Sequence, residues 1–215
     1  MQSKVILVHG YNKNKKDMFV LKENLEQLDY QCYVVDLPLT FKSIPTCTAM
    51  FKEKFRALTA ELTSEARINL VGHSTGGVII RNFLATTNQQ LTIDKVVLIA
   101  TPNQGSQLAN LAAKLSTLFV KVFKPINSLQ QDNFKTLNLK VPNEIALGAI
   151  AGTKSNLVLG NLLAGANDGR IQVKEVKDKT LDDFTVLPYG HKEIHYQFQT
   201  AKVVDYFLKN GQFEN

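Results

Sequence analysis

The segment LVGHSTGG at residues 70–77 constrains the fold of this chain more than any other. It begins in an apolar run typical of a buried strand, and Ser74 stands two residues from both Gly72 and Gly76. Glycines at this spacing let a strand turn sharply into a helix, because a Cβ at either position would collide as the chain doubles back. Such a turn exposes the serine Oγ, and the helix N-terminus favours negative charge beside it. The pattern therefore predicts that Ser74 is a nucleophile.

Apolar runs typical of buried strands alternate along the chain with segments of helical periodicity. Strands are expected at residues 4–8, 32–35, 68–71, 95–100, 145–151 and 184–187, and helices at 17–28, 46–64, 78–84 and 196–209. This alternation predicts an α/β fold with a mostly parallel central sheet of about six strands and helices on both faces. Functional residues of such sheets gather at the carboxyl ends of the strands, where His9, Ser74 and Thr101 are expected.

Residues 105–124 place leucines and phenylalanines at helical spacing with lysines beside them, and Pro125 is expected to end this helix. An amphipathic helix packed on the sheet explains the pattern, and for this segment it is a simpler explanation than contact with an anionic membrane surface. The segment also follows a strand end that faces Ser74. We therefore expect one domain over residues 1–215, in which residues 105–135 form a small cap and Leu108 and Leu111 line the substrate pocket.

The composition narrows the classes of function. Hydrophobic residues make up 44% of the 215 and charged residues 20%, as in globular chains with a sizeable core. With neither a bilayer-spanning run nor a signal peptide, a cytoplasmic location is expected. Cys32 and Cys47 fit no metal spacing, so we expect free thiols and no metal. The net charge of +6 suits an acidic substrate or an anionic membrane, although a solvated lysine surface explains it more simply. The sequence contains no basic stripe with interspersed aromatic residues, so nucleic-acid binding is not expected.

A serine hydroxyl needs a hydrogen-bonded base, and the chain offers four histidines. His9 and His73 are expected to shape the turns in which they lie, which leaves two candidates. His191 is favoured because it follows Gly190 in a loop at the carboxyl end of the sixth strand. His195, near the start of the last helix, is the rival base, or else a pocket-lining or solvated residue.

The base in turn needs a carboxylate that fixes its tautomer. Asp168 lies in the sequence ANDGR, which taken alone is simply a good turn. Its position between the serine and the histidine agrees with the order Ser, Asp/Glu, His found with this type of serine turn, and we therefore assign it as the acid. The tetrahedral intermediate needs N–H donors, which we expect from Thr75 and from the loop after the first strand. Tyr11 in that loop is expected to line the acyl pocket or to cover the sheet edge.

With these residues identified, the chain resembles a small lipase or esterase of the α/β-hydrolase superfamily. The resemblance rests on VHG at residues 8–10, GHSTGG at 72–77, TPNQGS at 101–106, NDGRI at 167–171 and His191. It implies Ser74 as nucleophile, Asp168 as acid and His191 as base. It also implies that the backbone amides of Tyr11 and Thr75 form the oxyanion hole.

The resemblance implies hydrolysis of a small-molecule acyl ester through an acyl-enzyme, with no cofactor. Acyl transfer and thioester hydrolysis on the same residues stay open, because pocket shape and access of water select the acceptor. A non-catalytic module that binds a lipid or a partner is a further alternative, since a fold does not by itself fix a function.

Overall fold

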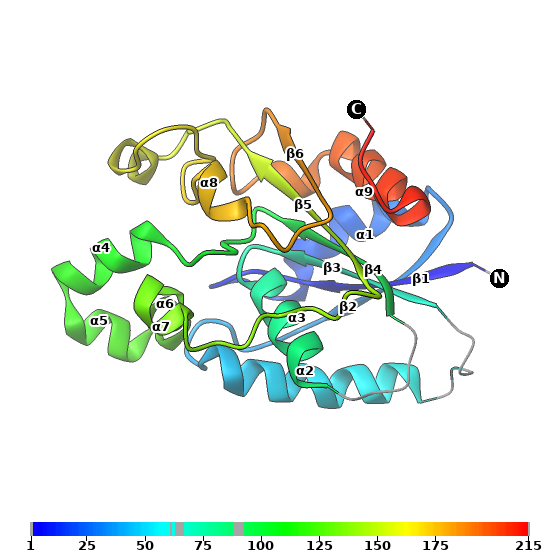
Figure 1. Ribbon diagram of the computed structural model, residues 1–215, viewed down its shortest axis with the longest axis horizontal. Coiled ribbons are helices and arrows are strands. Elements are labelled where there is room, and N and C mark those ends of the chain that lie inside the picture. The colour runs from blue at the N-terminus through cyan, green and yellow to red at the C-terminus, as the bar shows by residue number, and fades with distance from the viewer. Residues whose placement is uncertain (1, 61, 63–66, 88–92, 215) are drawn as a thin grey trace.

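The computed structural model describes residues 2–60, 62, 67–87 and 93–214. A six-stranded sheet forms its centre, with the order β2-β1-β3-β4-β5-β6, and every neighbouring pair is parallel (Figure 1). The strands are β1 (Ser3–Val8), β2 (Tyr30–Val35), β3 (Ile68–His73), β4 (Ile93–Ile99), β5 (Ala146–Gly152) and β6 (Asp183–Leu187). Parallel neighbours require crossover connections, which accounts for the alternation of strands and helices along the chain. The α/β fold predicted from the sequence is confirmed.

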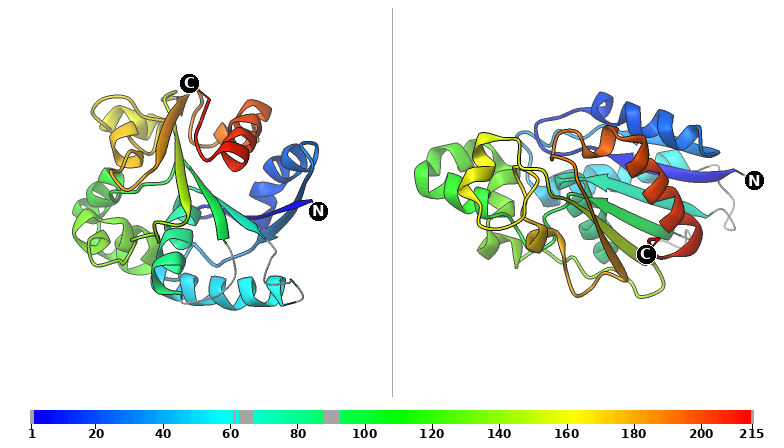
Figure 2. Two further views of the ribbon diagram at one scale, coloured as in Figure 1. Left: turned by 45° about the vertical axis from the view of Figure 1, so that its right-hand side comes forward. Right: turned by 90° about the horizontal axis from the view of Figure 1, so that it is seen from above.

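Helices cover both faces of the sheet (Figure 2). On one face, α1 (Phe19–Glu26) packs beside α9 (Phe198–Asn210), and on the other α2 (Ile44–Thr59) packs against α3 (Thr75–Thr86). Each pair buries its own apolar core against the sheet. The core under α2 and α3 contains Phe51 and Phe83, whose rings meet edge to face at 5.0 Å. All six residues of β3 are buried, as expected of a central strand covered on both sides.

The connection between β4 and β5 differs from the single helix expected over residues 105–124. It contains α4 (Gln107–Leu115), α5 (Thr117–Val122), α6 (Lys124–Leu129) and α7 (Gln131–Phe134). Ser116 separates the first two, because its backbone is extended while its hydroxyl accepts a hydrogen bond from the Phe119 N–H. Pro125 ends no helix, contrary to expectation. It lies in the first turn of α6, where the missing N–H of proline costs no helical hydrogen bond.

Two of the other expected helices differ from the observed ones at their N-terminal ends. The segment expected as a helix over 17–28 begins with a 3₁₀ turn, η1 (Lys15–Met18), and the last helix is preceded by the 3₁₀ turn η3 (Ile194–Tyr196). The expected end of the helix over 46–64 falls partly outside the described residues. The remaining short helices are η2 (Val158–Leu162) and α8 (Val173–Val176). In the described parts of the chain, every helix is too short or too polar to span a bilayer.

Candidate active site

Ser74 occupies a strained turn between β3 and α3. Its backbone has φ 53° and ψ −125°, a conformation that residues other than glycine rarely adopt. The turn fits only because its flanking positions lack side chains. A Cβ on Gly76 would lie 2.3 Å from the carbonyl oxygen of Val8, and one on Gly72 would lie 2.5 Å from the Cα of Gly77. The local sequence therefore dictates the turn, and the turn places the serine beyond the end of the central strand.

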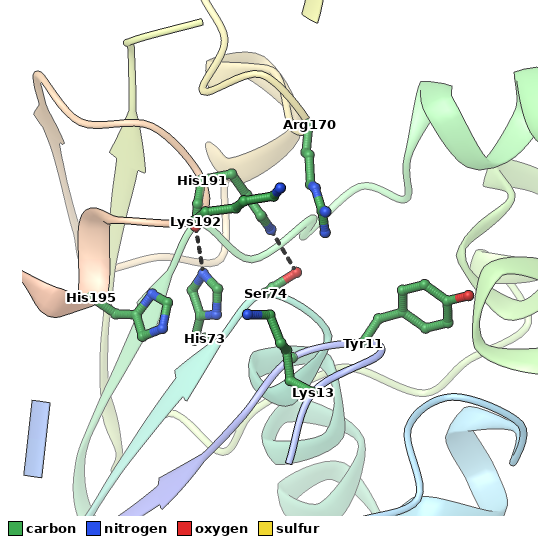
Figure 3. A pocket seen from close by; sticks show the side chains of 9 residues that line it. Tyr11, Lys13, His73, Ser74, Arg170, His191, Lys192 and His195 are labelled. Carbon is green, nitrogen blue, oxygen red and sulfur yellow. Dashed lines mark hydrogen bonds between the residues drawn. The ribbon is translucent and has the colours of Figure 1, made fainter. Parts of the chain in front are cut away.

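The side chain of His191 lies between those of Ser74 and Asp168. Its Nε2 is 3.1 Å from Ser74 Oγ, the contact drawn dashed in Figure 3, and its Nδ1 is 2.7 Å from Asp168 Oδ2. All three residues are buried, and Asp168 has no exposed surface. With Nδ1–H donating to the carboxylate, Nε2 is free to accept the serine proton. The structure thus brings together the three side chains that the sequence analysis selected.

Asp168 also organises the loop in which it lies. Its Oδ1 accepts the backbone N–H groups of Arg170 and Ile171 at 2.9 and 2.8 Å. Its own carbonyl oxygen accepts the N–H of His191 at 2.8 Å. The turn expected from the sequence and the contact with the imidazole therefore coexist. The turn uses one carboxylate oxygen and directs the other at His191.

His195, the rival base, does not reach Ser74. It is fully buried, so the expectation of a solvated side chain is wrong, and its ring stacks on that of His73 with centroids 3.9 Å apart. His73 in turn contacts the carbonyl oxygen of His191 through Nε2, at 3.1 Å. Burial lowers the pKa of both His73 and His195 below the ordinary histidine value, so both imidazoles are neutral near pH 7.

Asp17 is a buried carboxylate next to this stack, and no motif in the sequence distinguishes it from surface charge. Its Oδ1 accepts hydrogen bonds from Lys13 Nζ at 2.7 Å and from the Tyr196 hydroxyl at 2.6 Å. Its Oδ2 lies 3.2 Å from His195 Nε2, although these two atoms are not aligned for a hydrogen bond. Burial acts to raise the pKa of Asp17, but His195, Lys13 and Tyr196 outweigh burial and hold this pKa well below the usual range. No signal in the sequence indicates this contact, because only the folded chain buries His195 beside Asp17.

Asp17, His73 and His195 also offer ligand atoms that lie within 4.8 Å of one another. The two imidazole planes are inclined by only 24°, however, so their in-plane lone pairs cannot both point at one ion. Lys13 places a positive charge on the same carboxylate. This arrangement fits a buried polar cluster better than a metal site.

The N–H groups expected to form the oxyanion hole lie at the two chain segments that pass beside Ser74. Thr75 is the first residue of α3. Tyr11 follows Gly10, which packs so closely on Ser74 that a Cβ on Gly10 would lie 3.0 Å from Ser74 Cβ. Neither the Tyr11 nor the Thr75 N–H donates a hydrogen bond to another residue that the structure describes. Both donors are therefore available to a ligand at Ser74.

Two spaces of different character meet at Ser74. The first is an apolar pocket of about 350 Å³, whose wall includes side chains from α4, α5 and η2, namely Leu108, Leu111, Leu115, Phe119, Leu159 and Leu162. The second is a small polar cavity of about 10 Å³, bordered by Lys13, Arg170 and Lys192 (Figure 3).

Tyr11 borders both spaces, and its ring points away from Ser74 towards the helices between β4 and β5. There it meets the edge of Phe123, with ring centroids 6.3 Å apart. Burial raises the pKa of the Tyr11 hydroxyl, although nearby Arg170 opposes this shift. The hydroxyl is therefore neutral near pH 7.

Solved structures of several hydrolases have a similar fold. Bacillus licheniformis lipase BlEst2 in its propeptide form aligns with a TM-score of 0.86 and 22% identity, over 100% of this chain and 52% of that one. Its mature form aligns with a TM-score of 0.78 and 22% identity, over 98% and 92% of the two chains. The metagenomic carboxyl esterase MGS0156 has a TM-score of 0.75 and 14% identity, over 97% and 76%. This chain thus spans about half the length of the propeptide form.

At these identities the structural likeness establishes the fold alone. No curated protein matches the sequence significantly. The family described as alpha/beta hydrolase fold matches residues 4–125, which are more than half of the chain and include the Ser74 turn. The chain therefore belongs to the alpha/beta hydrolase fold family.

Proposed function

We propose that this protein hydrolyses carboxylic esters, with Ser74 as nucleophile, His191 as base and Asp168 as the acid that orients His191. The observation that carries the proposal is the continuous contact from Ser74 Oγ to His191 Nε2 at 3.1 Å and from His191 Nδ1 to Asp168 Oδ2 at 2.7 Å. A serine hydroxyl becomes an effective nucleophile when such a base removes its proton during attack.

The reaction proceeds in two halves. Ser74 Oγ bonds to the acyl carbon while His191 Nε2 takes the hydroxyl proton, and the resulting imidazolium is stabilised by Asp168. His191 then gives the proton to the leaving alcohol oxygen as the ester bond breaks, which leaves an acyl-enzyme. Water then attacks the acyl carbon of this intermediate while the same imidazole takes one of its protons. The bond between the acyl carbon and Ser74 Oγ breaks, His191 returns the proton to Oγ, and the carboxylic acid is released.

The oxyanion formed in each half would be bound by the Tyr11 and Thr75 amides. Their freedom from other partners among the described residues supports this role. Loss of one such donor costs about 2.7–4 kcal/mol of transition-state stabilisation in a well-studied protease. Because the donors are backbone groups, they stay in place when the side chains of these residues are replaced.

The acyl chain would occupy the apolar pocket lined by Leu108 and Leu111. We propose that residues 105–135 cap the site, because this segment supplies that wall of the pocket. Part of its outer surface is apolar, since Leu115 is 86% exposed and Leu118 70% exposed. Lys114, Lys121 and Lys124 are exposed in the same segment, and we therefore propose that it also contacts anionic lipid.

A fluorophosphonate probe tests the nucleophile. We expect the probe to add once per chain at Ser74, and Ser74→Ala to remove both labelling and hydrolysis of p-nitrophenyl butyrate. Ser128→Ala is the matched control, because the Ser128 hydroxyl donates to a carbonyl of its own helix and the residue lines neither space at Ser74. Labelling that survives Ser74→Ala would overturn the proposal. Release from acyl thioesters in parallel distinguishes ester from thioester hydrolysis.

A further inference from the structure

Basic side chains border the polar cavity beside Ser74, and their charge would influence which esters bind there. This inference rests on the proposed function, because it uses the path that the proposed reaction requires. The leaving alcohol oxygen must lie close to His191 Nε2, which protonates it. If the acyl chain fills the apolar pocket, the alcohol oxygen lies at the cavity bordered by Arg170 and Lys192 (Figure 3). At about 10 Å³ this cavity has room for about one water-sized group, so the rest of the alcohol extends outward past these two side chains. Arg170 borders the apolar pocket as well.

Three basic side chains border this cavity, and they differ in how far their charge is already neutralised. Lys13 is paired with Asp17, since its Nζ lies 2.7 Å from Oδ1. Within the described chain, no carboxylate oxygen lies within 4 Å of the nitrogen atoms of Arg170 or Lys192. Among the residues that the structure describes, these two positive charges beside Ser74 therefore have no counterion.

Nearby carboxylates are committed to other groups. Asp168 contacts His191 and two backbone N–H groups, and Glu193 contacts Lys154 and the N–H of Gly190. The loop geometry also fixes Arg170, because its backbone N–H donates to Asp168 Oδ1. The guanidinium therefore starts from a residue held directly beside the carboxylate that contacts His191. Arg170 is half-buried, so solvent screens its charge less than that of an exposed lysine.

We propose that Arg170 and Lys192 form a subsite for an anionic group on the alcohol portion of the ester, a phosphate or a carboxylate. A guanidinium presents paired N–H donors that match both anions, and Lys192 adds a second, more exposed positive charge. The preferred substrate is thus an ester with an apolar acyl chain and an acidic alcohol.

Matched butyryl esters test the subsite. The neutral compound is 1-butyrylglycerol, the anionic ones are 1-butyrylglycerol 3-phosphate and O-butyryl glycolate, and butyrylcholine is the cationic one. We expect kcat/KM to be at least about tenfold higher for an anionic ester than for the neutral one, as one charge-assisted hydrogen bond would produce. Preference for the phosphate alone, or for both anions, supports the subsite and identifies the anion. A wild-type ratio of one or less overturns it.

The ratio of anionic to neutral kcat/KM is then compared among variants. Arg170→Gln should lower this ratio about tenfold and Lys192→Gln about threefold, because the lysine is more exposed. Lys54→Gln is the control, since Lys54 is an exposed lysine of α2 that borders neither space. Added salt should shrink the wild-type ratio and leave the ratio of the double variant Arg170→Gln/Lys192→Gln nearly constant. An unchanged ratio in the double variant Arg170→Gln/Lys192→Gln overturns the proposal.

Binding separates this proposal from the proposed hydrolysis. Ser74→Ala cannot form an acyl-enzyme, so calorimetric titration of this variant with the same esters measures recognition alone. Tighter binding of an anionic ester than of 1-butyrylglycerol supports the subsite even if the wild type turns over neither compound, in which case only the hydrolysis proposal fails. Equal affinities would overturn the subsite.

Discussion

Asp168 contacts His191 at two points. Its Oδ2 lies 2.7 Å from the imidazole Nδ1, and its carbonyl oxygen accepts the backbone N–H of His191 at 2.8 Å. The carboxylate and the histidine loop are therefore positioned together. A change that spares the backbone contact can remove the charge while leaving both loops in place.

Asp168→Asn makes this change. The amide oxygen can still accept the N–H groups of Arg170 and Ile171, so we expect a Tm close to that of the wild type. The neutral amide no longer favours the His191 tautomer that has its proton on Nδ1. We therefore expect kcat for p-nitrophenyl butyrate to fall about 10⁴-fold, as it does in a serine protease with the equivalent change. Steady-state kinetics and thermal unfolding measure the two effects. Near-wild-type kcat would contradict the assignment of Asp168.

Asp168→Ala provides the comparison. It also removes the acceptor for the two N–H groups, which would then be buried without a partner. We expect an additional loss of about 1–3 kcal/mol in the free energy of unfolding, measured by urea denaturation.

Asp17→Asn should destabilise the fold although Asp17 does not touch Ser74. The carboxylate accepts from Lys13 and Tyr196 and faces His195, and loss of its charge should cost about 1–3 kcal/mol in the free energy of unfolding. Asp132→Asn is the control, because the side chain of Asp132 is 97% exposed and its pair with Lys135 is a surface contact. Equal effects of the two substitutions would argue against a structural role for the Asp17 cluster.

Stability should decrease as the pH falls below about 6.5, the ordinary histidine pKa. His73 and His195 have lowered pKa values in the folded protein, so in this range the unfolded chain binds more protons than the folded one. The free energy of unfolding therefore drops with falling pH. The lowered pKa of Asp17 adds a second loss that begins near pH 4, where an unfolded aspartate protonates. Tm measured between pH 8 and pH 4 checks this, and a constant Tm between pH 7 and pH 5 would contradict it.

Leu111→Trp should shorten the preferred acyl chain. Leu111 lies on the wall of the apolar pocket, and an indole there would occupy space that a long chain needs. We expect the ratio of kcat/KM for p-nitrophenyl octanoate to that for the acetate to fall by about tenfold or more. Leu118→Trp is the control, because Leu118 is 70% exposed and does not line the pocket. If both variants keep the wild-type ratio, the acyl chain does not bind there.

Flotation with liposomes tests the proposed lipid contact. Neutralising Lys114, Lys121 and Lys124 to glutamine should weaken binding to phosphatidylserine vesicles, since each lysine near an anionic surface contributes about 1 kcal/mol. A triple variant of lysines outside the cap, Lys52, Lys54 and Lys202 to glutamine, changes net charge equally. Equal loss of binding in both triple variants would indicate a general charge effect and not this surface.

The sheet and the Ser74 turn could be predicted from the sequence, because both depend on local patterns. Buried parallel strands are continuous apolar runs, and the turn requires glycine where a Cβ would touch the backbone of β1 or α3. The six strands were therefore predicted to within a few residues. The sequence order of serine, aspartate and histidine then selected Asp168 and His191, whose proximity to Ser74 the structure reports and whose catalytic roles stay predictions.

Features that depend on long-range packing were not predicted. The helix expected over residues 105–124 is interrupted because Ser116 caps α5, an effect of one hydroxyl that hydrophobic periodicity cannot reveal. Asp17 stands among lysines after the first strand and looks like surface charge. Only the folded chain brings it beneath His195, and its low pKa follows from neighbours that are distant in sequence.

The order of Ser74, Asp168 and His191 along the chain determines when they can meet during synthesis of the protein. Ser74 and its glycine turn lie in the first half, but the imidazole that contacts them belongs to the loop after the edge strand β6. A ribosome would therefore have to translate residue 191 before the three side chains could meet. Nascent chains that end before residue 191 would carry the serine without the imidazole that contacts it, so such incomplete copies would lack the proposed activity.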